Sequence, residues 1–246
     1  MKNFKKITGI IIASLFLLTS ITLQVSAAQR VPIFMYHASS EHNPGSLSEL
    51  YVRPSEFEAQ IRHLANNGYT FVTFDDWFNL HNIDKPVFIT FDDGYECNYT
   101  EIFPLLKKYN ARITIFLVAD QIGERGRLSE AMIREMSDSG LVKFESHTLS
   151  HPRLANISTD SRRLRNELQR SREIIEEITG RRVHAVSYPY GSFNSRVISA
   201  AREFYTLGVS TIHGKHNTAR HGDFEIRRMG IWRGTTMEQF TRMLEN

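Results

Sequence analysis

Short apolar runs alternate with amphipathic segments along most of the chain. Several of these runs are rich in β-branched or aromatic residues and lack strict alternation of apolar and polar positions, as expected for strands buried on both faces. Eight strands are predicted, at Val31–Tyr36, Thr70–Phe74, Pro86–Phe91, Arg112–Val118, Val142–Ser146, Val183–Tyr188, Thr206–Ser210 and Glu225–Trp232.

The segments between these runs carry helix signals. Ser55 and Glu58 form the pattern of a capping box, which predicts a helix that ends near Gly68. A second helix is predicted at about Thr159–Thr179, with Gly180 as its stop. One stripe of this second helix is expected to face the core, at Leu164, Leu168, Ser171, Ile175 and Ile178.

About eight strands with helices between them predict an α/β fold in which a parallel sheet closes into a barrel. The chain has no long low-complexity segment and no repeat of fixed period, so residues 29–246 are expected to form a single domain. Catalytic groups of such barrels collect in the loops at the carboxyl ends of the strands. Candidate chemistry is therefore expected in those loops.

The first 28 residues have the pattern of a secretory signal peptide. Three lysines precede the apolar run Ile7–Leu18, and small residues follow at Val25–Ala28. The alternative is an uncleaved anchor, but the apolar run is short for a membrane span. We expect cleavage after Ala27 or Ala28, no stable membrane span afterwards, and a secreted protein that can stay associated with the cell surface.

The charge balance changes once this leader is set aside. The chain has 30 Lys and Arg against 27 Asp and Glu, and removal of the three leader lysines leaves 27 of each. A near-neutral chain without a basic tract argues against nucleic acid as a partner. The single cysteine, Cys97, cannot form an internal disulfide, and no activating base is evident for it, so we expect it to be a packing residue. We also expect a monomer.

Two adjacent carboxylates follow the buried run Pro86–Phe91, in the sequence Asp92-Asp93-Gly94. Such a pair is costly unless something cationic compensates it. Neighbouring strand residues point to opposite sides, so one aspartate can bind a metal while the other stays free as a base. The alternative is a pair of solvated aspartates in a turn.

The same four residue types occur 17 positions earlier, at Thr73-Phe74-Asp75-Asp76, but Trp77 stands where the second copy has glycine. In this first copy, Asp75 or Asp76 is expected to be the N-cap of a short helix. We therefore interpret the first copy as structural and the second copy as catalytic.

A histidine pair follows another predicted strand. His147 and His151 come after Val142–Ser146, and their i, i+4 spacing places both imidazoles on one face of a helical turn, where they can share a metal ion. The alternative is two structural surface histidines. Together with one aspartate, the two histidines leave open positions on a divalent ion for water and substrate. With a free carboxylate as base, this arrangement predicts hydrolysis of an acyl group, either an amide or an ester.

These residues resemble the motifs of the polysaccharide deacetylase family, also called the NodB-homology or carbohydrate esterase family 4 domain. Thr90–Gly94 is similar to its first motif, which implies that Asp92 is the catalytic base and Asp93 a metal ligand. His147–His151 is similar to its second motif, which implies that both histidines bind the metal. The resemblance covers about residues 31–244 and implies a distorted (β/α) barrel of about seven or eight strands. The metal is expected to be a divalent ion, Zn²⁺ first, with Co²⁺, Ni²⁺ and Mn²⁺ as alternatives.

Tyr188–Gly191 resembles the third motif of the family, which forms one wall of the substrate groove. The resemblance implies that the backbone N–H of Tyr190 helps to stabilise the tetrahedral oxyanion. The residues expected to line the groove are Tyr95, Tyr188, Pro189 and Trp232. For Trp232, a core position is the alternative.

Two departures from the family pattern bear on the substrate. Ser187 stands where the third motif commonly has an arginine that orients the base, and the last motif, which supplies a general-acid histidine, is not evident. The opening run ends in Met35-Tyr36-His37 and resembles the subgroup that deacetylates poly-N-acetylglucosamine, in which the same two elements are altered. His37 is then the candidate general acid, with a histidine packed at the barrel rim as the alternative. The competing candidates are His213, His216 and His221.

The resemblance implies an enzyme that removes N-acetyl groups from a GlcNAc-containing polysaccharide, such as poly-N-acetylglucosamine, peptidoglycan glycan or a chitin-like chain. Two alternatives stay open: an O-acetyl esterase on xylan-like chains, and a carbohydrate-binding homologue that has lost catalysis. A binding protein has no need for an activated water, so the two aspartates and two histidines favour the enzyme.

Overall fold

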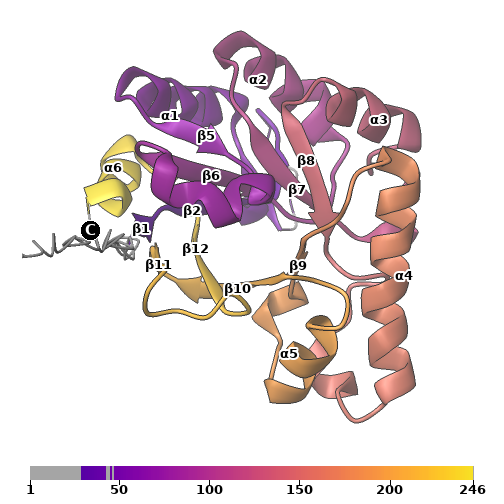
Figure 1. Ribbon diagram of the computed structural model, residues 1–246. Helices are drawn as coiled ribbons and strands as arrows, with labels where there is room; N and C mark the ends of the chain where they lie inside the picture. The colour runs from indigo at the N-terminus through magenta and orange to yellow at the C-terminus, as the bar shows by residue number, and fades with distance from the viewer. Residues whose placement is uncertain (1–28, 43–44, 46, 246) are drawn as a thin grey trace, which may run out of the picture.

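The computed structural model describes residues 29–42, 45 and 47–245, and the predicted signal peptide lies outside these residues. Seven parallel strands form a closed barrel in the order β2-β12-β10-β9-β8-β7-β6, because β2 pairs with both β12 and β6. Their bounds are β2 Ile33–Tyr36, β6 Pro86–Phe91, β7 Ile113–Leu117, β8 Val142–Ser146, β9 Ala185–Ser187, β10 Leu207–His213 and β12 Ile226–Gly230. The predicted α/β barrel is therefore confirmed (Figure 1).

Five further short strands lie beside this barrel. They are β1 Arg30–Val31, β3 Ala38–Ser39, β4 Tyr51–Val52, β5 Thr70–Val72 and β11 His216–Asn217. β5 pairs with the first half of β6, while β1 pairs with β11 and β3 with β4. Pro32 separates β1 from β2, so the first predicted strand is observed as two.

Helices cover the outside of the barrel (Figure 1). The α-helices are α1 Pro54–Asn66, α2 Phe103–Tyr109, α3 Glu130–Asp138, α4 Ser161–Thr179, α5 Ser195–Ala201 and α6 Met237–Glu245. α1 contacts α2 and α6, and α4 contacts α3 and α5. Within the part of the chain that the structure describes, no helix is long and apolar enough to cross a membrane.

Side chains alternate between the outside and the inside of the barrel along each strand. On β6, Val87 and Ile89 join the apolar cluster that includes residues of α1, α2 and α4, whereas Phe88 joins a second cluster inside the barrel. This inner cluster is fully buried and contains, from the barrel strands, Ile33, Phe88, Phe116, Ala185, Leu207, Val209 and Ile226. Phe74 and Trp77 pack against Phe88 and close the amino-terminal end of the barrel.

The same alternation makes the carboxyl-terminal part of the barrel polar on the inside. Thr90 and Asp92 continue the inward series of β6. Ser187 and Arg228 hold the equivalent positions on β9 and β12, each two residues beyond a member of the inner cluster. All four side chains are buried. The alternation of inward and outward side chains along the strands thus determines where polar side chains can lie inside the barrel.

The first α-helix begins earlier than predicted. The capping box expected at Ser55 and Glu58 is wrong, because α1 starts at Pro54. Glu56 accepts a hydrogen bond from the backbone N–H of Arg53 at 3.0 Å and so closes the box at that residue. Proline is favoured at the first helical position, which explains the earlier start.

The first Asp-Asp copy also caps a helix differently from the prediction. The 3-10 helix Phe74–Asn82 begins after Thr73 rather than after Asp75 or Asp76. Asp76 accepts a hydrogen bond from the backbone N–H of Thr73 at 2.9 Å, and Asp75 lies 2.7 Å from Lys143 Nζ. Both carboxylates therefore serve the structure.

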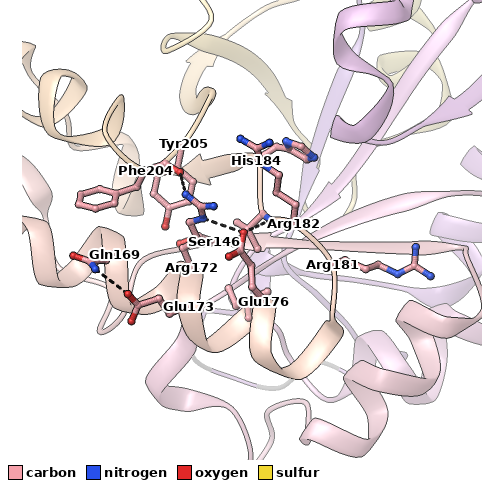
Figure 2. A network of polar contacts seen from close by, with 12 residues as sticks. Ser146, Gln169, Arg172, Glu173, Glu176, Arg181, Arg182, His184, Phe204 and Tyr205 are labelled. Carbon is pink, nitrogen blue, oxygen red and sulfur yellow. Dashed lines mark hydrogen bonds and ion pairs between the residues drawn. The ribbon is translucent and has the colours of Figure 1, made fainter.

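Helix α4 ends at Gly180, as predicted, where a φ of 64° lets the chain turn away. Its predicted stripe is buried. Arg172 donates hydrogen bonds to Glu176 at 2.9 Å and to the backbone carbonyl of Phe204 at 2.7 Å (Figure 2). Glu176 also accepts from the N–H of Val183. These bonds attach α4 to the segments that lead into β9 and β10.

Glu145 of β8 is buried with an ammonium group nearby. Its Oε2 atom accepts hydrogen bonds from the backbone N–H groups of His184 and Ala185 at 2.7 and 2.8 Å, and Lys143 Nζ lies 3.9 Å from Oε1. Burial raises the pKa of Glu145 to about 8, although Lys143 and the two hydrogen bonds act in the opposite direction.

We expect this carboxyl group to make the protein less stable as the pH rises. Between its ordinary pKa of 4.5 and the folded value of about 8, the folded state keeps a proton that the unfolded state has lost. Its stabilising contribution is full below the lower value and is lost as the pH approaches the higher one. In urea unfolding, the free energy of unfolding of the wild type minus that of Glu145→Gln should therefore fall with pH. A difference that stays flat across this range would contradict the assignment.

Candidate active site

Strand β6 ends in the aspartate doublet, and the chain turns sharply there. Asp93 has a φ of 73° and Gly94 a φ of 67°. A Cβ atom on Gly94 would lie 2.6 Å from Leu117 Cδ2, so both the backbone and the available space favour glycine. Asp92 is buried inside the barrel, whereas Asp93 is only half-buried. The glycine that distinguishes the two Asp-Asp copies is thus a steric requirement of this turn.

A buried arginine holds Asp92. Arg228 of β12 is 1% exposed and donates from Nη1 to Oδ1 and from Nη2 to Oδ2 of Asp92, both at 2.7 Å. Its donors also reach Thr90 Oγ1 at 3.1 Å, Ser187 Oγ at 2.9 Å and the carbonyl oxygen of Ser210 at 3.1 Å. This bidentate geometry fixes the carboxylate and balances its charge.

The arginine also sets the charge state of Asp92. Burial alone would raise the pKa of this carboxyl group, but Arg228 and His147 outweigh burial and hold the pKa well below its usual range. Asp92 is therefore ionised at neutral pH. Ser187 stands where the family commonly has an arginine, and Arg228 supplies the guanidinium from a different strand. Arg228 was not predicted as a site residue.

His147 and His151 converge, but the helical turn predicted from their spacing is wrong. Thr148 and His151 have φ values of 70° and 61°, so the segment is an irregular loop. The backbone N–H of His151 donates to Thr148 Oγ1 at 3.1 Å, and both the N–H and the hydroxyl of Ser150 donate to Glu167 of α4. These bonds bring the two Nε2 atoms to 3.2 Å from each other.

Within the described residues, one group of three or more His, Cys, Asp or Glu side chains has donor atoms that could hold a metal ion. It consists of Asp93, His147 and His151. Asp93 Oδ1 lies 3.5 Å from His147 Nε2 and 3.4 Å from His151 Nε2. Tetrahedral coordination with bonds of about 2.0–2.1 Å places ligand atoms about 3.4 Å apart. Both the donor set and its spacing fit a divalent ion such as zinc.

The histidines are prepared for ligation by their surroundings. Nδ1 of His147 donates to the carbonyl oxygen of Ser187 at 2.8 Å, because a carbonyl can only accept, and this leaves the Nε2 lone pair free. Burial and the neighbouring His147 lower the pKa of His151 to about 4, so His151 is neutral at neutral pH. A neutral imidazole with a free nitrogen is what a metal requires.

The cluster lies in a groove of about 740 Å³. The structure places Tyr95, Tyr190 and Trp232 in the lining of this groove, with Tyr190 and Trp232 among the most exposed large side chains. The Tyr190 ring lies 4.6 Å from that of His151, measured between centroids. Its backbone has a φ of 58°, which lies in the left-handed region.

The prediction that Tyr188 and Pro189 line the groove is wrong, since neither belongs to its lining. Tyr188 is fully buried, donates its hydroxyl hydrogen to the carbonyl of Phe224 at 3.2 Å and stacks on Phe193. Pro189 is buried beside it. Of the third motif, Tyr190 alone reaches the groove.

The four candidate general acids separate into two pairs. His37 and His213 line the groove, whereas His216 and His221 do not. His216 instead packs against Trp77 at the closed end of the barrel, with ring centroids 5.2 Å apart, and His221 packs against His216. The structure therefore excludes the second pair as acids in this groove.

His37 lies where the charges of Asp92 and Asp93 act on its ring. Its ring stacks against Trp232 with centroids 5.9 Å apart. Burial lowers its pKa, although Asp92 and Asp93 act in the opposite direction, so the ring is neutral at neutral pH in the free protein.

Cys97 lies beside Ser39 of β3. Its Sγ atom accepts a hydrogen bond from the N–H of Ser39 at 3.2 Å, and burial raises the pKa of the thiol to about 11. A protonated thiol of this kind is a packing residue.

A buried carboxylate beside a candidate metal site at one end of a parallel barrel suits metal-assisted hydrolysis. The family model for polysaccharide deacetylase matches residues 80–207. The chain is also 31% identical to YxkH of Bacillus subtilis (strain 168), a protein named after the same family. The alignment spans 234 residues and covers 93% of this chain and 81% of YxkH. The chain belongs to the polysaccharide deacetylase family and is a deacetylase.

Two further proteins show similarity over most of the chain. The poly-β-1,6-N-acetyl-D-glucosamine N-deacetylase of Staphylococcus aureus (strain MSSA476) is 25% identical over 217 residues, which cover 81% of this chain and 72% of that protein. The deacetylase PplD of Streptococcus pyogenes, solved in complex with acetate, has a TM-score of 0.82 at 27% identity and covers 89% of this chain and 100% of its own.

Arg228→Met should leave Asp92 buried without its partner. Breaking a buried ion pair costs about 3–5 kcal/mol of stability, and loss of the group that orients the base should lower kcat/KM by about 10- to 100-fold. The pKa of Asp92 should rise, so the acidic limb of the pH–rate profile should move to higher pH. Urea unfolding and acetate release at several pH values measure all three effects.

The double variant Ser187→Arg with Arg228→Met returns the guanidinium to the position where the family commonly has it. We expect it to recover part of the lost activity and to move the acidic limb back. A double variant no better than Arg228→Met in either respect would show that only β12 can supply the charge.

Proposed function

We propose that this protein is an exported, metal-dependent N-deacetylase of a GlcNAc-containing polysaccharide. The observation that carries the proposal is the cluster of Asp93, His147 and His151 beside Asp92, which Arg228 keeps ionised at the groove. A protein that only binds a glycan needs neither a metal cluster nor a paired buried base.

Each residue of the site has a part in the proposed reaction. Asp93, His147 and His151 would hold the ion, which when bound would lower the pKa of water and polarise the acetyl carbonyl. Asp92 accepts the proton of the attacking water, and its place beside the ligands, with Oδ2 at 3.9 Å from His147 Nε2, suits that role. The backbone N–H of Tyr190 donates to the acetyl oxygen, which becomes an oxyanion when the water oxygen bonds to the carbonyl carbon.

His37 is proposed to protonate the amine that leaves. It lines the groove on the side of Trp232. Since its pKa is lowered in the free protein, the ring is neutral at rest and takes up a proton from solvent once the substrate is bound. It gives this proton to the amine nitrogen as the C–N bond breaks, and Asp92 afterwards releases to solvent the proton that it took from the attacking water. Negative charge on the reacting acetyl group favours that uptake.

Three further points belong to the proposal. The acetamide of GlcNAc is favoured as the group that is cleaved, because the chain is similar to an N-deacetylase of poly-β-1,6-N-acetyl-D-glucosamine. Zinc is favoured because two imidazoles and one carboxylate at this spacing suit it. Export is favoured by the leader pattern of the first 28 residues.

Asp92→Asn and Asp93→Asn should have different effects. With Zn²⁺ and an N-acetylated β-1,6-GlcNAc oligosaccharide, Asp92→Asn should lower kcat by about 10²- to 10⁴-fold, as expected for loss of a general base, and should still bind zinc. Asp93→Asn should lose zinc affinity. Acetate release and zinc content after dialysis separate the two effects. If the wild type hydrolysed acetylated xylan and no N-acetylated glycan, the chain would be an O-acetyl esterase instead.

His37→Ala should lower kcat and leave KM nearly unchanged, because a general acid acts on the leaving group and not on substrate binding. His213→Ala serves as the matched control, since it removes another imidazole from the same groove. We expect the control to retain most of kcat. The reverse order of the two variants would assign the acid to His213.

A further inference from the structure

Two arginines line the groove next to the metal ligands, and the proposed reaction uses neither of them. Arg127 donates from Nη1 to the backbone carbonyl of Asp93 at 2.8 Å, so it lies on the side of that ligand. Arg153 follows His151 by two residues and lies on the side of the histidine loop.

Each guanidinium is stacked on a tyrosine ring of the groove. Arg127 Cζ and Arg153 Cζ both lie 4.2 Å from a ring centroid, that of Tyr95 and that of Tyr190 respectively. Stacking orients a guanidinium without using its N–H groups. Within the described residues, neither arginine forms an ion pair with a carboxylate, so donors on both remain available to a ligand.

Apart from these two arginines, the groove lining carries little uncompensated charge. The carboxylates in its lining are Asp92 and Asp93. Arg228 balances the first, and the second belongs to the metal-ligand cluster. With a divalent ion bound, the two stacked arginines therefore leave the groove with an excess of positive charge. A neutral glycan gains little from such a field, whereas an anionic glycan is attracted and oriented by it.

We propose that Arg127 and Arg153 form two anion-binding positions, and that the enzyme selects N-acetylated glycans in which sugars next to the cleaved acetamide carry anionic groups. Carboxylate and phosphate share the required chemistry, because either can accept two parallel N–H bonds from one guanidinium. This inference rests on the proposed function, since it names the substrate class of the same site.

The experiment compares two tetrasaccharides that differ only in charge. One alternates GlcNAc with N-acetylmuramic acid, whose lactyl ether carries a carboxylate, and the other is its neutral carboxamide. The zinc-loaded wild type should have a higher kcat/KM for the acid, and this preference should shrink at high salt because salt screens exposed charges. A 6-O-phosphorylated chitotetraose, tested beside them, distinguishes phosphate from carboxylate as the preferred anion.

Arg153→Gln is the main variant, because its guanidinium lies on the Tyr190 ring and forms no ion pair within the described residues. We expect it to lower the acid-to-amide ratio of kcat/KM by roughly tenfold, mainly through KM, with little change for the neutral substrate. Arg127→Lys keeps a charge near Asp93 and should lower the ratio less. Arg125→Gln and Arg162→Gln remove the same charge from exposed positions outside the groove and should change nothing.

Two results would overturn the inference: a wild-type ratio of one at low salt, or a ratio that Arg153→Gln and Arg127→Lys leave unchanged. Loss of turnover on every N-acetylated substrate would instead count against the proposed function. In that case, calorimetric binding of the acid and the amide to the zinc-loaded protein still decides the inference, because the two arginines should favour the acid without any turnover.

Discussion

The buried ion pair between Arg228 and Asp92 is the interaction on which the arrangement of the site depends. It joins β12 to β6 across 136 positions of sequence, and it reaches β9 through Ser187 and β10 through Ser210. Taking two charges out of water costs several kcal/mol for each ion, so such a pair persists only where the remaining donors and acceptors are also satisfied. The barrel must therefore close in one register, and that register places an ionised carboxylate beside the candidate metal ligands.

The loops around this pair hold strained backbone. Of the seven non-glycine residues with positive φ in the described chain, four belong to the site: Asp93, Thr148, His151 and Tyr190. Each such conformation costs on the order of 1–3 kcal/mol and persists only where its surroundings determine it. Arg127 holds the carbonyl of Asp93, and the Thr148 hydroxyl oxygen holds the N–H of His151. The strain is thus offset by local hydrogen bonds, which aim the ligand atoms at one point.

Features written within a few consecutive residues could be predicted from the sequence, whereas those that depend on distant partners could not. The buried strands and the aspartate doublet follow from local pattern, and Gly94 separates that doublet from its structural copy. Arg228 was missed because its partner lies far away in sequence and because the adjacent Arg227 hides the alternation of β12. The helical turn predicted for the histidine pair was wrong because Glu167 of α4 binds Ser150 and holds that loop in another conformation. The prediction that Tyr188 lines the groove was wrong because its side chain is buried in the core.

The position of the arginine shows which requirement of the site is strict. The buried carboxylate of Asp92 needs a guanidinium within hydrogen-bonding distance, but a closed barrel offers that place to more than one strand, because inward side chains of one layer meet near the axis. Ser187 and Arg228 both contact Asp92, at 3.4 and 2.7 Å. The two positions are therefore coupled: two arginines would crowd the same space with like charge, and two serines would leave the carboxylate unpaired. When the sequence alone is compared with the family motif, Ser187 indicates the loss of a functional group. In three dimensions, the charge is retained and only the strand that supplies it differs.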